Sequence, residues 1–162
     1  MAGGARKTAR TDSFSVRRVR SSDVSHVIAL DERVTGLAKP DYWRDVFERY
    51  GKSRGQERHF LVAEPNPPDA RTPILGFIIG EVRAWEFGSS PCGWVFALSV
   101  EPKARLHGIG HELFAAISDE FARAKVGKMR TMVARDNRLH LLFFRGEGMM
   151  AGPYIQLEKE LE

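Results

Sequence analysis

Apolar and polar residues alternate over 14–19, and this alternation predicts a strand there. Two amphipathic stretches follow it. Ser21 or Ser22 is placed to cap the first as a helix, and the second, "KPDYWRDVFERYG", is expected to stop at Gly51. The apolar positions of both stretches recur at helical spacing and predict two helices: Val24, Val27, Ile28, Val34, Trp43, Val46, Phe47 and Tyr50.

Three apolar segments in the middle of the chain predict strands over 58–64, 74–87 and 94–101. The proline-rich stretch 65–73 predicts a loop, because proline cannot donate a ladder hydrogen bond. The second of the three strands is long, and we expect it to bend at one of its glycines. The third is apolar on both faces, which is typical of a central position in a sheet.

The last third of the chain predicts a helix over about 108–125, a strand over 129–135, a helix over 137–148 and a final strand over 153–161. Asp136 is placed to cap the second of these helices, and the final segment alternates. The order β, α, α, β, β, β, α, β, α, β indicates one mixed α/β domain without an internal repeat.

Length and composition fit this single domain. The chain has 162 residues, of which 43% are hydrophobic and 28% charged, enough for one core of its own. No apolar run approaches the roughly 20 residues that a membrane span requires, and the basic N-terminal region lacks the apolar block of a secretory signal. Cys92 is the only cysteine, which excludes an internal disulfide. We therefore expect a cytoplasmic protein with no membrane partner.

The net charge of +4 belongs to the N-terminal region rather than to the domain. Residues 1–20 carry six basic side chains and one acidic one, whereas the other 142 residues carry 19 basic and 20 acidic ones. A nucleic-acid-binding domain keeps a basic face within its folded part, so this distribution argues against a nucleic-acid partner. We expect residues 1–13 to be a disordered basic tail and residues 14–162 to form the domain.

The stretch "VEPKARLHGIGHELFAAI", residues 100–117, carries the clearest chemical signal. An apolar strand stops at a proline, and a basic turn with Gly108 and Gly110 leads into a helix. The first turn of a helix leaves N–H groups unpaired, and the helix dipole adds partial positive charge there. Arg105 and His107 can add side-chain donors to phosphate oxygens. We therefore expect a phosphate or pyrophosphate at this turn.

Familiar nucleotide-binding and metal-binding motifs fit this turn less well. "GIGHEL" does not follow the dinucleotide fingerprint, and no glycine-lysine-serine/threonine follows it, which excludes a Walker loop. His107 and His111 share a helical face, but no third ligand is evident, so we expect no metal. A helix that is merely capped and holds no ligand remains the alternative.

At this turn the chain resembles the GNAT superfamily of acetyl-CoA-dependent N-acetyltransferases. The family signature Arg/Gln-x-x-Gly-x-Gly/Ala corresponds to residues 105–110, and the preceding "FALSVEP" resembles the family's fourth strand. The segment from Asn137 to Met149 is similar to the asparagine-led segment of the family. The resemblance covers about 14–161. It implies one twisted, mixed and mostly antiparallel sheet flanked by helices, the GNAT-like acyl-CoA acyltransferase fold.

The resemblance also implies a role for each matching position. Backbone amides of the turn and the helix mouth would hold the pyrophosphate of coenzyme A, the strand edge before the turn would pair with its pantetheine arm, and Asn137 and Phe144 would contact the arm or the thiol. One N–H group of the strand edge would polarise the acetyl carbonyl. The turn residues are Arg105, Leu106, His107, Gly108, Ile109, Gly110 and His111, and the edge residues are Leu98, Ser99 and Val100.

Two positions depart from the family pattern. Where members often carry a tyrosine as general acid, this chain has Phe144, and a glutamate used as a base by many lysine-directed members would fall near Cys92. Glu81 is our candidate base, with an exposed strand glutamate paired to an arginine as the alternative. Tyr154 is our candidate proton donor, with a packed core tyrosine as the alternative. Cys92 itself is expected to be an ordinary buried cysteine.

The function implied is transfer of an acetyl group from acetyl-CoA to a primary amine by direct attack. The acceptor is open among a protein lysine, a protein N-terminus and a small amine, with a lean toward a protein lysine, because no insertion encloses a small substrate. Aromatic residues cluster in the segments that line the acceptor groove of the family, and the loop over 85–94 would shape a pocket or a homodimer contact; they are Tyr42, Trp43, Trp85, Phe87 and Trp94. The alternative function is a catalytically weak or inactive acyl-CoA-binding regulatory module.

Overall fold

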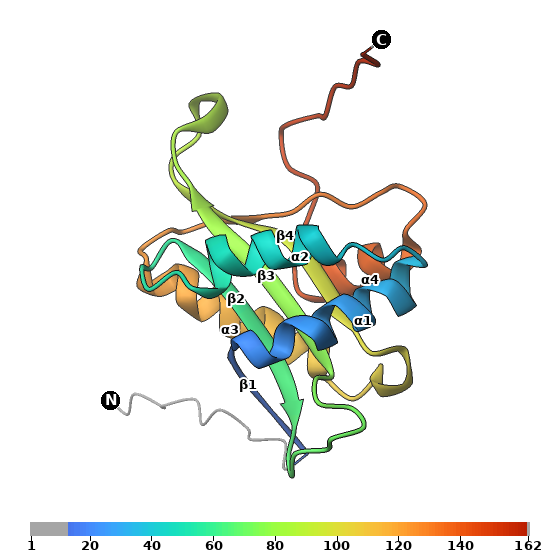
Figure 1. Cartoon of the computed structure of the whole chain (residues 1–162). Coiled ribbons are helices and arrows are strands. Elements are labelled where there is room, and N and C mark those ends of the chain that lie inside the picture. The colour runs from blue at the N-terminus through green and yellow to red at the C-terminus, as the bar shows by residue number, and fades with distance from the viewer. Residues whose placement is uncertain (1–12, 162) are drawn as a thin grey trace, which may run out of the picture. The chain divides into compact units, whose positions relative to one another are not determined.

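The chain forms a five-stranded sheet whose strands pair in chain order (Figure 1). The structure is a computed structural model and describes residues 13–161. All neighbouring strands are antiparallel except the last pair, which is parallel. This is the mixed, mostly antiparallel sheet expected from the sequence. The strands are β1 (Phe14–Arg18), β2 (Arg58–Pro65), β3 (Gly76–Arg83), β4 (Cys92–Val100) and β5 (Met129–Arg130).

Helices cover one face of the sheet through a large apolar core (Figure 1). They are α1 (Val24–Thr35) and α2 (Pro40–Val46), and α2 continues as a wider turn, η2 (Phe47–Gly51), which ends at Gly51 as predicted. The Trp43 ring lies edge-on to Phe77 at 5.1 Å between centroids. Its indole N–H donates to the buried carboxylate of Asp31 at 2.9 Å, and Lys39 also contacts that carboxylate at 2.9 Å. These contacts join α1 to α2.

The opposite face of the sheet is covered by α3 (Ile109–Arg123), which matches the helix predicted over about 108–125. Its Leu113, Ile117 and Phe121 are fully buried. Glycine in the strands permits this close approach, because a Cβ at Gly93 would lie 2.4 Å from the Phe121 ring. The predicted bend of β3 is also present, since the β3–β4 register shifts between Ile79 and Gly80.

Several predicted boundaries are wrong. Neither Ser21 nor Ser22 caps α1; a short 3-10 turn, η1 (Ser21–Asp23), precedes it, and the Asp23 carboxylate accepts from the Arg20 N–H at 2.7 Å. The strand predicted over 74–87 ends at Arg83, after which Trp85 and Phe87 adopt positive φ.

The C-terminal part differs most from the prediction. The structure divides into two units, one up to Met132 and one from Val133 onward. The strand expected over 129–135 is reduced to two residues, because β5 pairs only with Gly93 and Trp94. The strand expected over 153–161 is absent: this segment has no ladder partner among the described residues and lies exposed. An alternating sequence becomes a strand only where a neighbouring strand accepts its hydrogen bonds.

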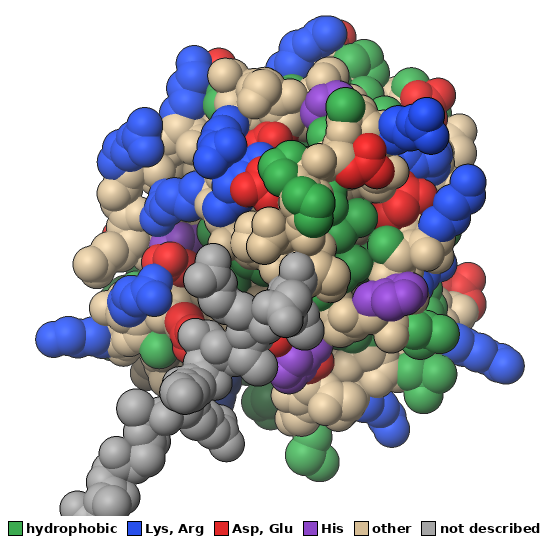
Figure 2. Space-filling model, turned by 90° about the horizontal axis from the view of Figure 1, so that it is seen from below, with side chains coloured by type: hydrophobic (Ala, Val, Ile, Leu, Met, Phe, Trp, Pro, Cys, Tyr) green, Lys and Arg blue, Asp and Glu red, His purple; other side chains and the backbone are tan. Residues whose placement is uncertain are grey.

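The second unit contains α4 (Arg138–Gly146), as predicted, but its cap is one residue later than expected. The side-chain oxygen of Asn137, not of Asp136, accepts from the His140 N–H at 3.1 Å. On the face seen in Figure 2, Lys and Arg side chains mingle with Asp, Glu and hydrophobic ones. The tail expected over 1–13 falls outside the described residues except for Ser13.

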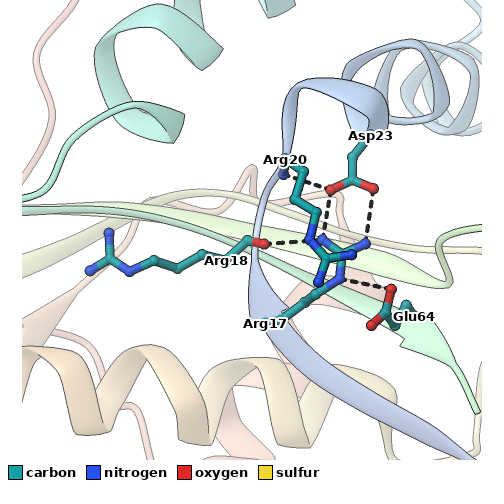
Figure 3. Close-up of polar contacts among 5 residues, drawn as sticks. All are labelled: Arg17, Arg18, Arg20, Asp23 and Glu64. Carbon is teal, nitrogen blue, oxygen red and sulfur yellow. Dashed lines mark hydrogen bonds and ion pairs between the residues drawn. The ribbon is translucent and has the colours of Figure 1, made fainter.

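A partly buried ion-pair cluster joins β1, η1 and β2 (Figure 3). Arg17 on β1 donates to both oxygens of Asp23 at 2.7 and 3.0 Å, and its Nε lies 2.7 Å from Glu64 on β2. Burial alone would raise the pKa of Asp23. The hydrogen bonds from Arg17 and the Arg20 N–H, with the charge of Arg17, outweigh that effect and lower the pKa of Asp23 below its ordinary value. The cluster thereby fastens η1 to the edge of the sheet.

This cluster predicts a pH-dependent loss of stability in Asp23→Asn. At neutral pH the variant should unfold with a free energy lower by about 1–2 kcal/mol, because Arg17 and the Arg20 N–H lose a charged acceptor. Because the pKa of Asp23 is lower in the folded state than in the unfolded state, its charge stabilises the fold fully above the unfolded-state pKa of about 4. This stabilisation is lost as the pH falls through the folded-state pKa. The difference in unfolding free energy between wild type and variant should therefore narrow below pH of about 4. Urea denaturation at neutral pH and below pH of about 4 measures this difference.

The matched control is Asp41→Asn, which removes the exposed carboxylate that Arg44 contacts at 3.1 Å. Exposed pairs contribute little, so this variant should match the wild type at both pH values. Equal losses in the two variants, or none in Asp23→Asn, would contradict the role assigned to the cluster.

Candidate functional site

One edge of β4 loses its neighbouring strand soon after β4 begins. β5 pairs with Gly93 and Trp94 alone, and the Thr131 hydroxyl donates to the Val95 carbonyl at 2.8 Å just beyond that pairing. From Phe96 to Val100, β4 keeps its β3 neighbour but has no β5 partner among the described residues. A strand edge without a neighbour presents N–H and C=O groups that another extended chain can pair with.

An extra residue in β4 decides which amides face this open edge. Gly80 is opposite Val95 and Ile79 is opposite Ala97, so Phe96 is the inserted residue. Before it, the Gly93 N–H donates toward β5, to the Lys128 carbonyl at 2.8 Å. After it, the Glu101 N–H donates toward β3, to the Leu75 carbonyl at 2.8 Å.

The alternation of a strand then assigns the remaining amides. Because Glu101 points its N–H toward β3, the N–H groups of Leu98 and Val100 point toward the open edge, and that of Ser99 points toward Phe77 of β3. Two of the three predicted edge residues thus present their backbone to the opening. If Phe96 instead paired with β3 in regular register, the amides of Ala97 and Ser99 would face the open edge.

The turn after β4 carries its chain into α3 through two left-handed residues. A short 3-10 turn, η4 (Pro102–Ala104), comes first, with the Ala104 N–H donating to the Glu101 carbonyl at 2.8 Å. Leu106 and Gly108 then have φ of 68° and 79°, and the Leu106 side chain is exposed. His107 reaches back, with its Nδ1 3.1 Å from the Ala104 carbonyl.

The mouth of α3 has the geometry of an anion site. Gly108 is its N-cap, and no side chain caps the helix. Ile109 and Gly110 occupy the first turn, where N–H groups lack helical partners and the dipole is positive. Arg105, half-buried and in an extended conformation, leads into this mouth. The seven predicted turn residues, Arg105 to His111, therefore form one continuous turn and helix start.

A second group of residues lies on the α1–α2 side of the sheet, near the open edge of β4. We call Tyr50, Glu81, Arg83, Trp94 and Phe96 the acceptor-side cluster. Tyr50 donates to Glu81 at 2.9 Å, and Arg83 donates to the other Glu81 oxygen at 3.1 Å. The Arg83 guanidinium lies 4.9 Å from the Trp94 ring, and the Tyr50 ring meets Phe96 edge-on at 5.1 Å.

The carboxylate of Glu81, the candidate base, therefore already accepts hydrogen bonds from Tyr50 and Arg83. Its side chain is 19% exposed, and Arg58 lies 3.9 Å from the carboxylate besides Tyr50 and Arg83. Burial, followed by the hydrogen bond to Glu81 and the charge of Glu81, raises the pKa of Tyr50, so its hydroxyl stays protonated and donates. Of the expected alternative, an exposed strand glutamate paired with an arginine, the pairing is present, but the Glu81 side chain is half-buried rather than exposed. Tyr50 was not among the predicted site residues, because its place on the apolar stripe of its helix suggested only a core role.

The predicted site residues of the second unit are described within that unit. Asn137 caps α4, and the buried Phe144 ring lies near His140 and Phe143, at centroid distances of 6.0 and 5.2 Å. Tyr154 is 49% exposed, on a segment that is neither helix nor strand. The packed core tyrosine considered as an alternative for Tyr154 is therefore not found.

The remaining aromatic candidates do not form one groove. Trp43 is buried in the core and Tyr42 lies edge-on to it, whereas Trp85 and Phe87 are exposed on the β3–β4 connection. Cys92 is a buried free cysteine, as expected. Within residues 13–161, no group of three or more His, Cys, Asp or Glu side chains could hold a metal ion. No helix in this part of the chain has the length and apolar character needed to cross a membrane.

Known proteins share this fold. The structure is similar to an aminoglycoside N-acetyltransferase, AAC(6')-Iy, in complex with CoA, with a TM-score of 0.77 at 15% identity over 93% of this chain and 97% of that one. A glucosamine-6-phosphate N-acetyltransferase from Arabidopsis thaliana gives 0.69 at 18% identity over 92% and 99%. A transcriptional regulator from Bacillus halodurans C-125 gives 0.73 at 14% identity over 91% and 99%.

No curated protein sequence matches the chain. The sequence nevertheless matches the model of the acetyltransferase (GNAT) family over residues 24–146, a span that runs from α1 through β4 and the turn to the end of α4. The resemblance inferred from the signature is thereby confirmed. With most of its length matched, the chain belongs to the acetyltransferase (GNAT) family, whose co-substrate is acetyl-CoA.

Proposed function

We propose that this protein transfers an acetyl group from acetyl-CoA to a primary amine by direct attack, without a covalent enzyme intermediate. The observation that carries the proposal is the continuity of β4 with the turn. One strand presents the amides of Leu98 and Val100 at an open edge and then leads through η4 and a short turn to the N-terminus of α3, which no side chain caps. An extended pantetheine arm and a pyrophosphate are joined in the same order in coenzyme A.

Each part of this surface suits a different part of the co-substrate. The residues from Arg105 to Gly110, with His111, would hold the pyrophosphate by backbone N–H groups and by the Arg105 side chain. The Leu98 and Val100 amides would pair with the pantetheine amides. Asn137 and Phe144 stay candidates for contacts with the arm or the thiol. When bound, acetyl-CoA supplies an activated thioester.

The chain then has three tasks in the reaction. It must place a neutral amine near the thioester carbonyl, stabilise the developing oxyanion and receive the amine proton. As the new C–N bond forms, the C–S bond breaks and the thiolate leaves. A β4 amide would donate to the carbonyl oxygen. Glu81 would receive the proton, directly or through water, and Tyr154 stays a candidate donor to the thiolate.

A second function is favoured by specific observations. Glu81 already accepts from Tyr50 and Arg83, and a phenyl ring at Phe144 cannot donate a proton. A catalytically weak or inactive acyl-CoA-binding module of the same fold would retain the open edge and the helix mouth and lack turnover. Binding of CoA alone is common to both functions, so turnover must separate them.

The charge of the acceptor-side cluster bears on the acceptor. Arg58 and Arg83 lie near the single carboxylate of Glu81, which leaves a net positive charge there. The proteins named as aminoglycoside acetyltransferases act on polycations, which such a surface repels. A primary amine that also carries an anionic group fits better, whether as an amino sugar phosphate or as a lysine with acidic neighbours on a protein.

The proposed cofactor site predicts that the wild type binds CoA and acetyl-CoA but not ATP, and that Gly108→Ala weakens CoA binding. Gly108 has φ of 79°, a conformation that costs a residue with a Cβ about 1–2 kcal/mol. The strained turn should raise the Kd for CoA about tenfold, measured by isothermal titration calorimetry. Gly88→Ala is the matched control, because Gly88 has φ of 70° but lies in the β3–β4 connection. Equal effects in both variants would refute a site at the turn.

The role of Glu81 predicts a separation of turnover from binding. In Glu81→Gln, kcat should fall about a hundredfold, while the Kd for CoA stays unchanged. Tyr50→Phe removes a donor to the same carboxylate and should have a smaller effect. A fall in thermal stability with unchanged kcat would assign Glu81 a structural role, and no turnover by the wild type would favour the inactive module.

The acceptor proposal predicts a preference among amines in a thiol-release assay. Glucosamine 6-phosphate, or a lysine peptide with acidic neighbours, should give a kcat/KM at least about tenfold above that of an aminoglycoside, because of charge complementarity. Arg58→Gln should reduce this preference without loss of CoA binding. A preference for the aminoglycoside would show that the positive charge does not face the acceptor.

A further inference from the structure

Glu101 is a charged residue buried at the junction between β4 and the turn. Its side chain is 10% exposed, and Arg33 in the last turn of α1 contacts it with Nη2 at 2.6 Å and Nε at 3.2 Å. A nine-tenths buried carboxylate is costly unless it is paired. The pair therefore ties α1, which lies over one face of the sheet (Figure 1), to the first residue after β4.

The backbone of Glu101 is also held by hydrogen bonds on both its N–H and its carbonyl. Its N–H donates to the Leu75 carbonyl and its carbonyl accepts from the Ala104 N–H, both at 2.8 Å. Ala104 in turn contacts His107 through its carbonyl at 3.1 Å. A continuous series of hydrogen bonds thus runs from the Arg33–Glu101 pair through η4 to the residue before Gly108. The contact from Arg33 is the one link in this series that comes from another helix, α1.

The charge of Glu101 also matters. A carboxylate lies four residues before Arg105, close to a turn suited to a pyrophosphate, and like charges repel. Arg33 neutralises that carboxylate. Its own side chain is 50% exposed, so solvent screens its attraction, but the buried carboxylate is not screened to the same extent. Loss of Arg33 would release the turn from α1 and leave an unpaired buried negative charge at the start of the turn.

We propose that Arg33 and Glu101 form a positioning pair for the cofactor turn: Arg33 holds and neutralises Glu101, and Glu101 sets the turn that binds the pyrophosphate. The inference rests on the proposed binding of acetyl-CoA at that turn. Neither residue touches the reacting atoms, and their effect is on the affinity for CoA. The pair also makes the position of α1, on the acceptor side, part of what holds the cofactor turn.

The test is calorimetric titration of the full-length protein with CoA, beside a thermal unfolding curve for each variant. Arg33→Met should raise the Kd about tenfold, which corresponds to about 1.4 kcal/mol. Arg33→Lys keeps the charge and should stay within about threefold of the wild type. The double variant Arg33→Met with Glu101→Gln should bind CoA more tightly than Arg33→Met alone, because the unpaired buried charge is gone.

The matched control is Lys39→Met. Lys39 contacts the buried Asp31 carboxylate of α1 at 2.9 Å, so this variant also strips a cation from a buried acid on the same helix, away from the turn. It should lower the melting temperature and leave the Kd for CoA unchanged. An unchanged Kd in Arg33→Met, an equal rise in Lys39→Met, or a double variant no better than Arg33→Met would overturn the inference. No CoA binding by the wild type would overturn the proposed function together with it.

Discussion

The rest of the site depends on an unmet hydrogen-bonding requirement in the backbone of β4. A strand inside a sheet needs partners on both edges, yet β5 accompanies β4 for only two residues. The extra residue at Phe96 then turns the amides of Leu98 and Val100 outward instead of those of their neighbours. An edge with alternating donors and acceptors is suited to an extended ligand with amides of its own. The proposed binding surface is thus an open sheet edge, which the pantetheine arm of acetyl-CoA would extend as an added strand.

The turn that follows shows how strain is held in place. Leu106 adopts a left-handed conformation that costs a non-glycine residue about 1–2 kcal/mol. Such a conformation persists only where the surrounding contacts determine it. Here η4 is tied to Glu101, His107 contacts η4, and Glu101 is paired to α1. The packing and ion pairing of the first helix therefore help to set the shape of a turn that follows the fourth strand.

Much of this architecture could be predicted from sequence because its causes are local. Apolar spacing predicted α1, α2, α3 and the inner strands, and the residues from Arg105 to Gly110 predicted the turn and the start of α3. What failed depends on partners that local pattern does not specify. The segment over 153–161 alternates like a strand but has no neighbour to pair with among the described residues, and β5 ends where its pairing ends. The insertion at Phe96, and the contacts of Glu81 with Tyr50 and Arg83, likewise depend on how neighbouring segments meet in the fold.

Binding and catalysis place different requirements on this fold, as Glu81 shows. The features that suit the co-substrate are mostly backbone groups, which many side chains leave intact at positions other than the left-handed Gly108. A base, by contrast, needs one particular carboxylate with a free path to a proton, and Glu81 is also the acceptor that fixes Tyr50 to β3. To take a proton it must exchange one of those bonds for a bond to water or to the amine. Direct attack on a thioester tolerates a weak base, because placing the amine beside the carbonyl provides much of the acceleration. A half-buried, paired glutamate is therefore compatible with acetyl transfer, provided that the site places the amine beside the thioester carbonyl.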